Sequence, residues 1–571
     1  MADTDTSGWD AIVIGSGMSG GWAAKELCER GLKVLVLERG RPITPEDDYT
    51  DMLDPWERPH LDRVNEDEKA KHYPVQSKVY SFSETTKQFW VKDDEHPYEI
   101  SQGGDFNWRR GYHLGGRSLM WGRQSYRLGP GDFTANKNDG HGVDWPIRYD
   151  DLAPWYDHVE KFAGISGARD NIDILPDGQH FLPPFEMNCA EIEFRKKIAS
   201  NYDDRQMIMG RVANLSRPTD DQTALGRGQC QTRNRCHQGC SFGAYFSSLS
   251  ATLPAAEATG NLTVITDAIV QELEFDAASE KVTGVRVVNA KTKDASVYRS
   301  KIVFLNASTI PTAMILLNSK SEAMPRGLAN RSDQVGRNIM DHVGGSKVLA
   351  SVPGNRDKYY WGNRPTGSYI PRYRNVGDQA SEFKRGYAFQ VYSWRNGVSA
   401  GASSIGKEFK LKNRTPGTWS MMLDAFCEVL PYADNRVKLH NNKTDAWGTP
   451  VPVVHANMGE NEKAVLNAAH EDALEMFGAA GFENIYAVEK PDTHMTAIGG
   501  RTHEMGTARM GRDPETSVLN KWNRAHDVKN LFITDGSAMT SSACQNPSLT
   551  YMALSARAAH YAADQIQNGD L

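Results

Sequence analysis

Three cysteines crowd into one short segment of the chain. Cys230, Cys236 and Cys240 are separated by five and by three residues. Three soft thiolates on one loop can hold an iron–sulphur cluster, and a set of three ligands suits a 3Fe–4S cluster or a 4Fe–4S cluster with an outside ligand. From the spacing alone, zinc with His237 as a fourth ligand stays open, as do free or disulfide-paired cysteines.

The charged residues within this segment are both positive. We expect Arg233 and Arg235 to lower the pKa values of the neighbouring thiols and to offset part of the charge of an anionic cluster. The remaining cysteines are scattered along the chain, and we expect them to be plain buried thiols. They are Cys28, Cys189, Cys427 and Cys544.

A glycine-rich turn near the N-terminus has the spacing of a phosphate-binding loop. Residues 10–14 form an apolar run, residues 15–20 read Gly-Ser-Gly-Met-Ser-Gly, and a helical pattern leads to a second apolar run at 33–37 that ends at Glu38. The first two glycines allow a tight turn and close approach by a pyrophosphate, and the third packs the helix against the strand. Glu38 is placed to bind a ribose hydroxyl pair. The unit therefore predicts dinucleotide binding, and its position near the N-terminus favours FAD over NAD.

The composition limits the classes of function. The chain has 571 residues, of which 39% are hydrophobic and 24% are charged, and its formal net charge is -7. This balance offers no broad basic surface for nucleic acid, and the length indicates two or more structural units. There is no apolar run of roughly eighteen residues, so we expect no membrane-spanning helix. The first residues lack a basic region and a twin-arginine pair, so we expect no export signal in this chain.

Two further segments carry residues that can do chemistry. Residues 111–122 contain paired glycines followed by Ser118, which fits a loop lying against a large planar ligand; a plain loop leading into a helix is the alternative. Near the C-terminus, His503 is followed by an apolar strand at 530–534 and then by Asn546 at the start of an alanine-rich helix. Taken alone, His503 could simply satisfy a buried loop and Asn546 could simply cap the helix.

In this order, the motifs resemble the glucose–methanol–choline (GMC) family of FAD oxidoreductases. The resemblance covers nearly the whole chain and includes Asp-Trp-Pro-Ile at 144–147, Val-Gly-Arg-Asn at 335–338 with Asp341-His342, and Asn-Arg-Val at 435–437. It implies an α/β fold, in which a Rossmann-like FAD-binding domain, discontinuous in sequence, joins a substrate domain of antiparallel sheet plus helices.

The resemblance also implies domain ranges. The FAD-binding domain is expected at 8–44, 111–150, 211–345 and 491–571, with the cysteine segment at 230–240. The substrate domain, with an excursion that serves as a lid or an interface, is expected at 45–110, 151–210 and 346–490.

The resemblance implies the catalytic residues as well. His503 matches the catalytic histidine of the family and Asn546 its second active-site position. A histidine can accept the hydroxyl proton near neutral pH, and an asparagine can orient the hydroxyl oxygen while FAD takes the hydride. Met120 stands where some relatives bind flavin covalently through a histidine, so we expect non-covalent FAD. The residues implied to contact FAD are Gly15, Gly17, Ser19, Gly20, Glu38, Arg39, Gly115, Gly116, Ser118, Trp121, Gly122, Val270, Asp535, Gly536 and Pro547.

The cysteine segment is similar to that of catalytic subunits of bacterial iron–sulphur sugar dehydrogenases, of the glucoside 3-dehydrogenase, FAD glucose dehydrogenase and fructose dehydrogenase types. This similarity implies that Cys230, Cys236 and Cys240 bind a 3Fe–4S cluster that passes electrons from the flavin to a cytochrome c. The chain has no Cys-x-x-Cys-His haem motif, so the cytochrome would be a separate polypeptide. A small subunit bearing the export signal would place the enzyme in the periplasm or at the membrane, with a cytoplasmic location as the alternative.

The implied reaction is oxidation of a sugar hydroxyl, with C3 of glucosides or related pyranosides as the favoured position. Oxidation at C1 of aldoses or at C2 of gluconate stays open, as do an oxygen-using pyranose oxidase and a zinc-stapled flavoprotein without turnover. Aromatic and polar residues in the expected substrate domain suit sugar rings, although each is as well explained as a core or interface residue. They are Tyr359, Tyr360, Trp361, Tyr392, Trp394 and Arg395.

Overall fold

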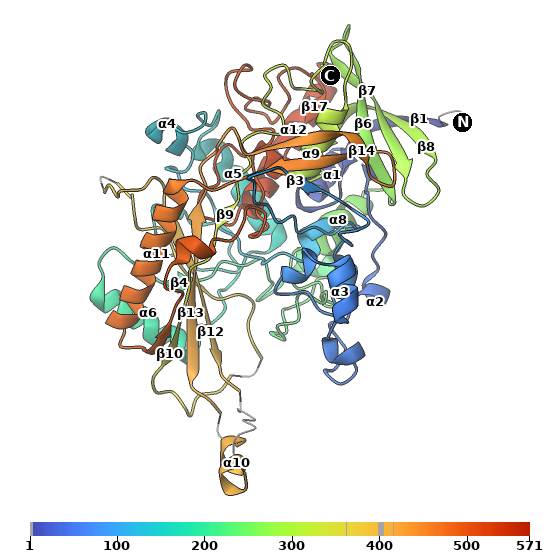
Figure 1. Ribbon diagram of the computed structural model, residues 1–571. Coiled ribbons are helices and arrows are strands. Elements are labelled where there is room, and N and C mark those ends of the chain that lie inside the picture. Colours follow the sequence, from blue (N-terminus) through green and yellow to red (C-terminus); the bar gives the residue numbers. More distant parts are fainter. Residues whose placement is uncertain (1–3, 361, 378, 398–404, 415) are drawn as a thin grey trace.

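The computed structural model describes the chain except residues 1–3, 361, 378, 398–404 and 415, so Trp361 lies outside the described residues. Two sheets dominate the arrangement. In Figure 1 the sheet that contains β1 lies in the upper part of the molecule, near both termini, and the sheet that contains β13 lies below it. The predicted α/β organisation, with one parallel-rich and one antiparallel sheet, is observed.

The first sheet has the Rossmann-like arrangement. Its order is β5-β2-β1-β8-β7-β6, with β17 paired to β8. The pairs β1–β2, β2–β5, β1–β8 and β8–β17 are parallel, whereas β6–β7 and β7–β8 are antiparallel. Its strands are β1 (Thr4–Ile14), β2 (Val34–Leu37), β5 (Leu262–Ile265), β6 (Ala268–Asp276), β7 (Lys281–Asn289), β8 (Ala295–Leu305) and β17 (Leu531–Phe532).

The second sheet is antiparallel. Its order is β16-β10-β13-β12-β11-β4, with β9 paired to β13, and helices α6 and α11 lie beside it in Figure 1. Residues 342–343 form β9, which pairs with β13 of this sheet. Its strands are β4 (Ile208–Met209), β9 (His342–Val343), β10 (Lys347–Val352), β11 (Ser368–Ile370), β12 (Tyr387–Arg395), β13 (Trp419–Glu428) and β16 (Glu483–Tyr486).

A small third sheet and the helices complete the fold. The third sheet contains β3 (Glu99–Ile100), β14 (Arg436–Thr444) and β15 (Pro450–His455). Within the described residues, no helix is both long and apolar enough to span a bilayer. The helices are α1 (Met18–Glu29), α2 (Pro45–Asp48), α3 (Glu66–His72), α4 (Ala135–Asp139), α5 (Tyr149–Ala163), α6 (Cys189–Asn201), α7 (Asp220–Ala224), α8 (Leu253–Glu257), α9 (Thr309–Asn318), α10 (Lys407–Lys412), α11 (Glu460–Ala479) and α12 (Ser548–Gln567).

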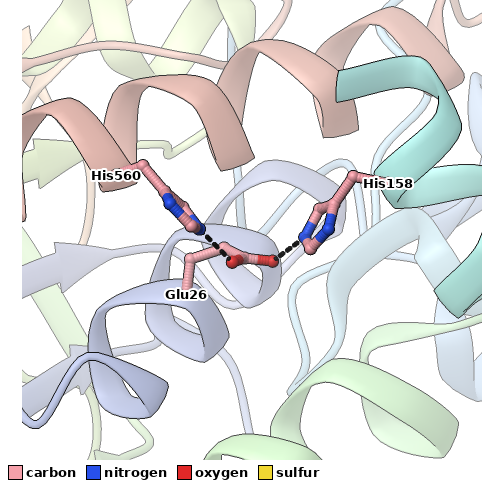
Figure 2. A group of neighbouring side chains, drawn as sticks. All are labelled: Glu26, His158 and His560. Carbon is pink, nitrogen blue, oxygen red and sulfur yellow. Dashed lines mark hydrogen bonds and ion pairs between the residues drawn. The ribbon is translucent and has the colours of Figure 1, made fainter. Parts of the chain in front are cut away.

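One buried carboxylate joins helices α1, α5 and α12. Oε1 of Glu26 in α1 accepts a hydrogen bond from Nε2 of His158 in α5, and Oε2 accepts one from Nε2 of His560 in α12, both at 2.7 Å. Figure 2 shows the three side chains. Lys25 Nζ lies 3.0 Å from Oε1 of the same carboxylate. Burial opposes the charge on Glu26, but these hydrogen bonds and the lysine outweigh it and lower the pKa of the carboxyl group.

These residue types also occur in metal sites, but the surroundings of His560 favour a hydrogen-bonded clamp. Arg30 Nη1 lies 3.4 Å from Nδ1 of His560, and a guanidinium can only donate. Nδ1 therefore accepts, and Nε2 of the neutral ring carries the proton that it donates to Glu26. A histidine that bound a metal through Nε2 would need an acceptor at Nδ1.

We expect Glu26→Gln to lower the apparent unfolding temperature by several degrees, because breaking a buried ion pair from one side costs about 3 kcal/mol. Glu29→Gln is the matched control, since Glu29 pairs with the same lysine at 2.8 Å but its side chain is 42% exposed. Thermal unfolding followed by circular dichroism measures both variants.

The pH dependence of this difference has a definite sign. A lowered pKa in the folded state means that Glu26 stabilises the fold above its ordinary pKa of 4.5, so the difference should shrink as the pH falls below that value. Equal unfolding temperatures of the two variants at pH 7 would contradict the clamp.

Candidate active site

A cavity of about 820 Å³ lies between the two large sheets. One wall comes from the turn after β1, the end of β2 and the loop at 108–124. Further lining comes from β12 and β13 of the second sheet and from the loops that hold His503 and Asn546.

The glycine turn that follows β1 is built as the sequence predicts. Gly15 has a φ of +94°, and a Cβ there would lie 2.4 Å from the carbonyl oxygen of Asn306. A Cβ on Gly20 would lie 1.8 Å from the carbonyl oxygen of Gly15, so the third glycine allows α1 to pack against the turn. Gly17 has open space at its Cβ position and lines the cavity, which leaves room for a ligand at the start of α1.

Glu38 stands at the end of β2 and lines the same cavity. Its Oε2 accepts hydrogen bonds from the backbone N–H of Ser16 at 3.1 Å and from the Ser16 hydroxyl at 2.5 Å. Its Oε1 accepts from the backbone N–H of Gly40 at 2.8 Å, which leaves acceptor capacity on that oxygen. Burial raises the pKa of this carboxyl group, while the donors around it oppose the rise.

The second glycine pair faces the first. Gly115 and Gly116 both have positive φ, at 83° and 50°, and a Cβ on Gly116 would lie 3.3 Å from Cα of Gly17. The hydroxyl of Ser118 donates to the carbonyl oxygen of Gly115 at 2.5 Å and accepts from the backbone N–H of Ser248 at 3.0 Å, which fixes the turn.

Most residues expected to contact FAD line this one cavity. Gly20 and Gly115 do not line it, because they act within the packing of the two turns. The lining residues of the predicted set are Gly15, Gly17, Ser19, Glu38, Arg39, Gly116, Ser118, Trp121, Gly122, Val270, Asp535, Gly536 and Pro547.

His503 and Asn546 meet in the lining of the cavity. Nδ2 of Asn546 lies 3.3 Å from Nε2 of His503, and Oδ1 of Asn546 accepts from Nε2 of Gln390 at 2.8 Å. On its far side His503 contacts His342, with the two Nδ1 atoms 2.9 Å apart. Burial lowers the pKa of His503 well below its ordinary value, and the nearby His342 and the charges of Arg501 and Arg117 lower it further, so the ring is neutral near pH 7.

The structure adds Gln390 to the residues singled out from the sequence. Gln390, Tyr392, Ser393 and Trp394 of β12 all line the cavity, and the two aromatic residues among them are those that the sequence indicates as suited to a sugar ring. Arg395 points elsewhere and donates to backbone carbonyl oxygens, including that of Lys358 at 2.9 Å. The contact between His342 and His503 could not be predicted from the Asp341-His342 motif, because the two histidines lie far apart in the sequence.

The cysteine segment borders the same cavity. Its Asn234 and His237 line the cavity, whereas the three cysteines do not. In the described chain all three cysteines are free and half-buried.

The expected effect of the two arginines on the thiols is wrong for Cys230 and Cys240. Burial raises the pKa of Cys230 to about 11, and burial also raises that of Cys240. Arg233 instead pairs with the carboxylate of Asp51, and Arg235 donates to the carbonyl oxygens of Asp51 at 3.0 Å and of Leu53 at 2.8 Å. Both arginines thus bind the loop that contains Asp51 and Leu53.

Comparison with known proteins agrees with this geometry. Two GMC oxidoreductase family profiles match residues 10–344 and 431–555. The chain belongs to the GMC oxidoreductase family. Membership implies FAD as the cofactor and alcohol groups as the site of oxidation, and it confirms the predicted family and fold class.

Two relatives match this protein along almost its whole length. The fructose dehydrogenase large subunit of Gluconobacter japonicus is 28% identical over 99% of both chains. The 2-methyl-1,2-propanediol dehydrogenase of Mycolicibacterium austroafricanum is 30% identical over 97% of this chain and 94% of its own. A crystal structure of pyridoxine 4-oxidase from Mesorbium loti, 16% identical, covers 97% of this chain and 99% of its own with a TM-score of 0.58, which shows the shared fold.

We expect Gly17→Val to abolish FAD binding without unfolding the protein. The backbone at residue 17 has a φ of -68°, which valine adopts, and the side chain would enter the open space that we assign to the cofactor. Flavin absorbance per protein and thermal unfolding measure the two effects separately.

Gly478→Val is the control, since its Cβ position is also open but lies on α11 away from the cavity. Normal FAD content in the Gly17 variant would show that the cofactor lies elsewhere.

Proposed function

We propose that this GMC oxidoreductase is a sugar dehydrogenase that oxidises a secondary hydroxyl group, with C3 of a glucoside or related pyranoside as the position attacked. The observation that carries the proposal is a neutral His503 paired with Asn546 in a cavity that is also lined by polar and aromatic side chains. FAD, when bound, supplies the acceptor for the hydride of the carbinol carbon.

His503 takes the hydroxyl proton at Nε2. Its lowered pKa keeps that nitrogen unprotonated at neutral pH, as a general base requires. Nδ2 of Asn546, beside the same nitrogen, is placed to donate to the substrate oxygen, and Gln390 fixes the orientation of the asparagine amide through a 2.8 Å hydrogen bond. Asn546 orients the alcohol oxygen without carrying a charge, and His503 takes up the hydroxyl proton and becomes positively charged.

The second wall of the cavity suits a sugar. Tyr392, Trp394 and Phe426 offer ring faces, while Asp424 and Arg501 offer charged hydrogen-bonding groups. The match to the fructose dehydrogenase large subunit supports a sugar substrate. A 30% identical match over 146 residues to the C-glycoside 3-oxidase of Arthrobacter globiformis supports C3 as the position.

We also propose that Cys230, Cys236 and Cys240 hold an iron–sulphur cluster of the 3Fe–4S type. Thiolates around one zinc ion at about 2.3 Å stand about 3.8 Å apart. Among the described residues the three sulfur atoms do not all lie within 4.8 Å of one another. This spacing is wider than one zinc ion bound by all three thiolates requires, so the proposal takes an iron–sulphur cluster rather than zinc.

Such a cluster, when bound, supplies one-electron transfer away from the flavin. The residues between cavity and cysteines support this role, because Asn234 and His237 belong to both the cysteine segment and the cavity lining. The acceptor in this proposal is a separate cytochrome c. A small signal-bearing subunit would bring the complex to the periplasm or the membrane, and the relative described as a large subunit supports a multi-subunit enzyme.

A panel of substrates tests the proposed specificity. Glucosides, free aldoses, gluconate, fructose and 2-methyl-1,2-propanediol are each supplied with a dye acceptor, and the product is identified by NMR. The expected product is a 3-keto glycoside. Exclusive oxidation of aldoses at C1, of gluconate, or of the non-sugar diol would refute the C3 assignment, and peroxide formation in air without need of a dye would indicate an oxidase.

We expect His503→Gln to lower the anaerobic rate of flavin reduction by about 10²- to 10⁴-fold, the usual contribution of a general base. His180→Gln, on an exposed loop residue, is the control. In the wild type the rate should stay flat from pH 8 to below pH 6.5, because the lowered pKa keeps His503 unprotonated beneath its ordinary value of 6.5. Full activity of the His503 variant would refute the base assignment.

We expect anaerobically purified protein to contain about three iron atoms per flavin and to absorb broadly above the flavin bands. Cys236→Ser should remove the iron and the transfer of electrons to cytochrome c while leaving anaerobic flavin reduction by substrate intact. Cys189→Ser, at a half-buried cysteine outside the segment, is the control and should keep the iron. Flavin without iron, or zinc in place of iron, would refute the relay.

A further inference from the structure

A continuous line of hydrogen bonds runs behind the catalytic pair. Nε2 of His342 lies 2.8 Å from the carbonyl oxygen of Ala543, and Nδ1 of His342 lies 2.9 Å from Nδ1 of His503. Nε2 of His503 then faces Nδ2 of Asn546 at 3.3 Å. The line starts and ends on the same loop, since Ala543 and Asn546 are three residues apart.

The carbonyl oxygen of Ala543, where the line starts, sets the donor and the acceptor of each hydrogen bond along it. A backbone carbonyl oxygen can only accept, so Nε2 of His342 carries a proton and donates it. His342 is fully buried, and burial lowers its pKa to about 3, so the ring is neutral and Nδ1 holds a lone pair. Nδ1 must therefore accept, and the proton between the two histidines belongs to Nδ1 of His503.

This assignment decides what His503 can do. A neutral imidazole carries one proton, so a proton on Nδ1 leaves the lone pair on Nε2. Nε2 is the nitrogen that faces Asn546 and the cavity. In the opposite tautomer, Nε2 would carry the proton and could not accept one from an alcohol.

The two rings are held so that this contact is fixed. The carboxylate of Asp341 accepts the backbone N–H of His342 at 2.7 Å and that of His503 at 3.1 Å, which ties both residues to one side chain. Phe426 packs against both imidazoles, with ring centroids 5.9 Å from His342 and 6.0 Å from His503. Glu428 accepts the backbone N–H of Ala543 at 3.0 Å and so holds the loop that bears the terminal carbonyl group.

We propose that His342 is a positioning residue that selects the tautomer of His503, with the proton on Nδ1 and the accepting lone pair on Nε2. The proposal rests on the proposed function of His503 as the base. It assigns to His342 no contact with substrate or flavin.

Two variants of similar size separate hydrogen bonding from packing. In His342→Asn, Oδ1 occupies the branch position of Nδ1 and can still accept from His503. In His342→Leu, a methyl group takes that place and nothing accepts. The limiting rate of flavin reduction under anaerobic conditions is measured with the best substrate of the panel, together with FAD content and thermal unfolding.

We expect the leucine variant to lose about 10²-fold in limiting rate, as loss of the correct base tautomer predicts, with the substrate concentration for half-maximal rate changed less than about 3-fold. The asparagine variant should remain within about 10-fold of the wild type. Equal losses in both variants, or no loss in the leucine variant, would overturn the proposal and leave His342 as a packing residue.

A direct readout covers the case in which the leucine variant does not retain FAD. Nitrogen NMR of the ¹⁵N-histidine-labelled wild-type holoenzyme, with the His503 signals assigned by their loss in His503→Gln, should show a protonated Nδ1 and an unprotonated Nε2. The reverse pattern would overturn the tautomer assignment. Wild-type turnover in His503→Gln would instead refute the proposed function, so the two failures are distinguishable.

Discussion

The buried carboxylate of Asp341 holds the backbone around the proposed catalytic residue His503 in place. It accepts four backbone N–H groups, those of His342, Gly499, Arg501 and His503, at 2.7 to 3.1 Å. These donors compensate for the loss of water, although burial and the nearby charge of Glu504 still raise the pKa of the group to about 7. Through it, strand β9 of the second sheet is fastened to the loop that carries His503.

The two arginines that lower the pKa of His503 are each paired with a carboxylate. Arg501 binds Asp424 at 2.6 and 2.9 Å, and Arg117 binds Glu504 at 2.7 Å. Both arginines lower the pKa of His503, after burial and together with His342. A neutral base is the form that proton removal from an alcohol requires.

The cysteine segment is held by groups outside itself. Asp51, 179 residues before Cys230 in the chain, accepts from Arg233 and from the backbone and hydroxyl of Ser241 at 3.2 and 2.6 Å. Because Arg233 is paired in this way, the positive charge of the segment does not lower the pKa values of Cys230 and Cys240 below their ordinary value. The excursion at 45–110 thus contributes to the cysteine loop as well as to the rim of the cavity, where Tyr80 lies.

The family and the α/β fold could be predicted from the sequence because they depend on local patterns, and most of the residues predicted to contact FAD line one cavity. A glycine needed at a tight turn and an acidic residue at a strand end are visible within thirty residues. The partners of His503 could not be predicted in this way, since His342 lies 161 residues away. The bridge between Met340 and Met505 and the hydrogen bonds of both backbones to Asp341 bring it near. The raised pKa values of Cys230 and Cys240 also depend on the tertiary structure, because burial raises them and Arg233 pairs with the distant Asp51.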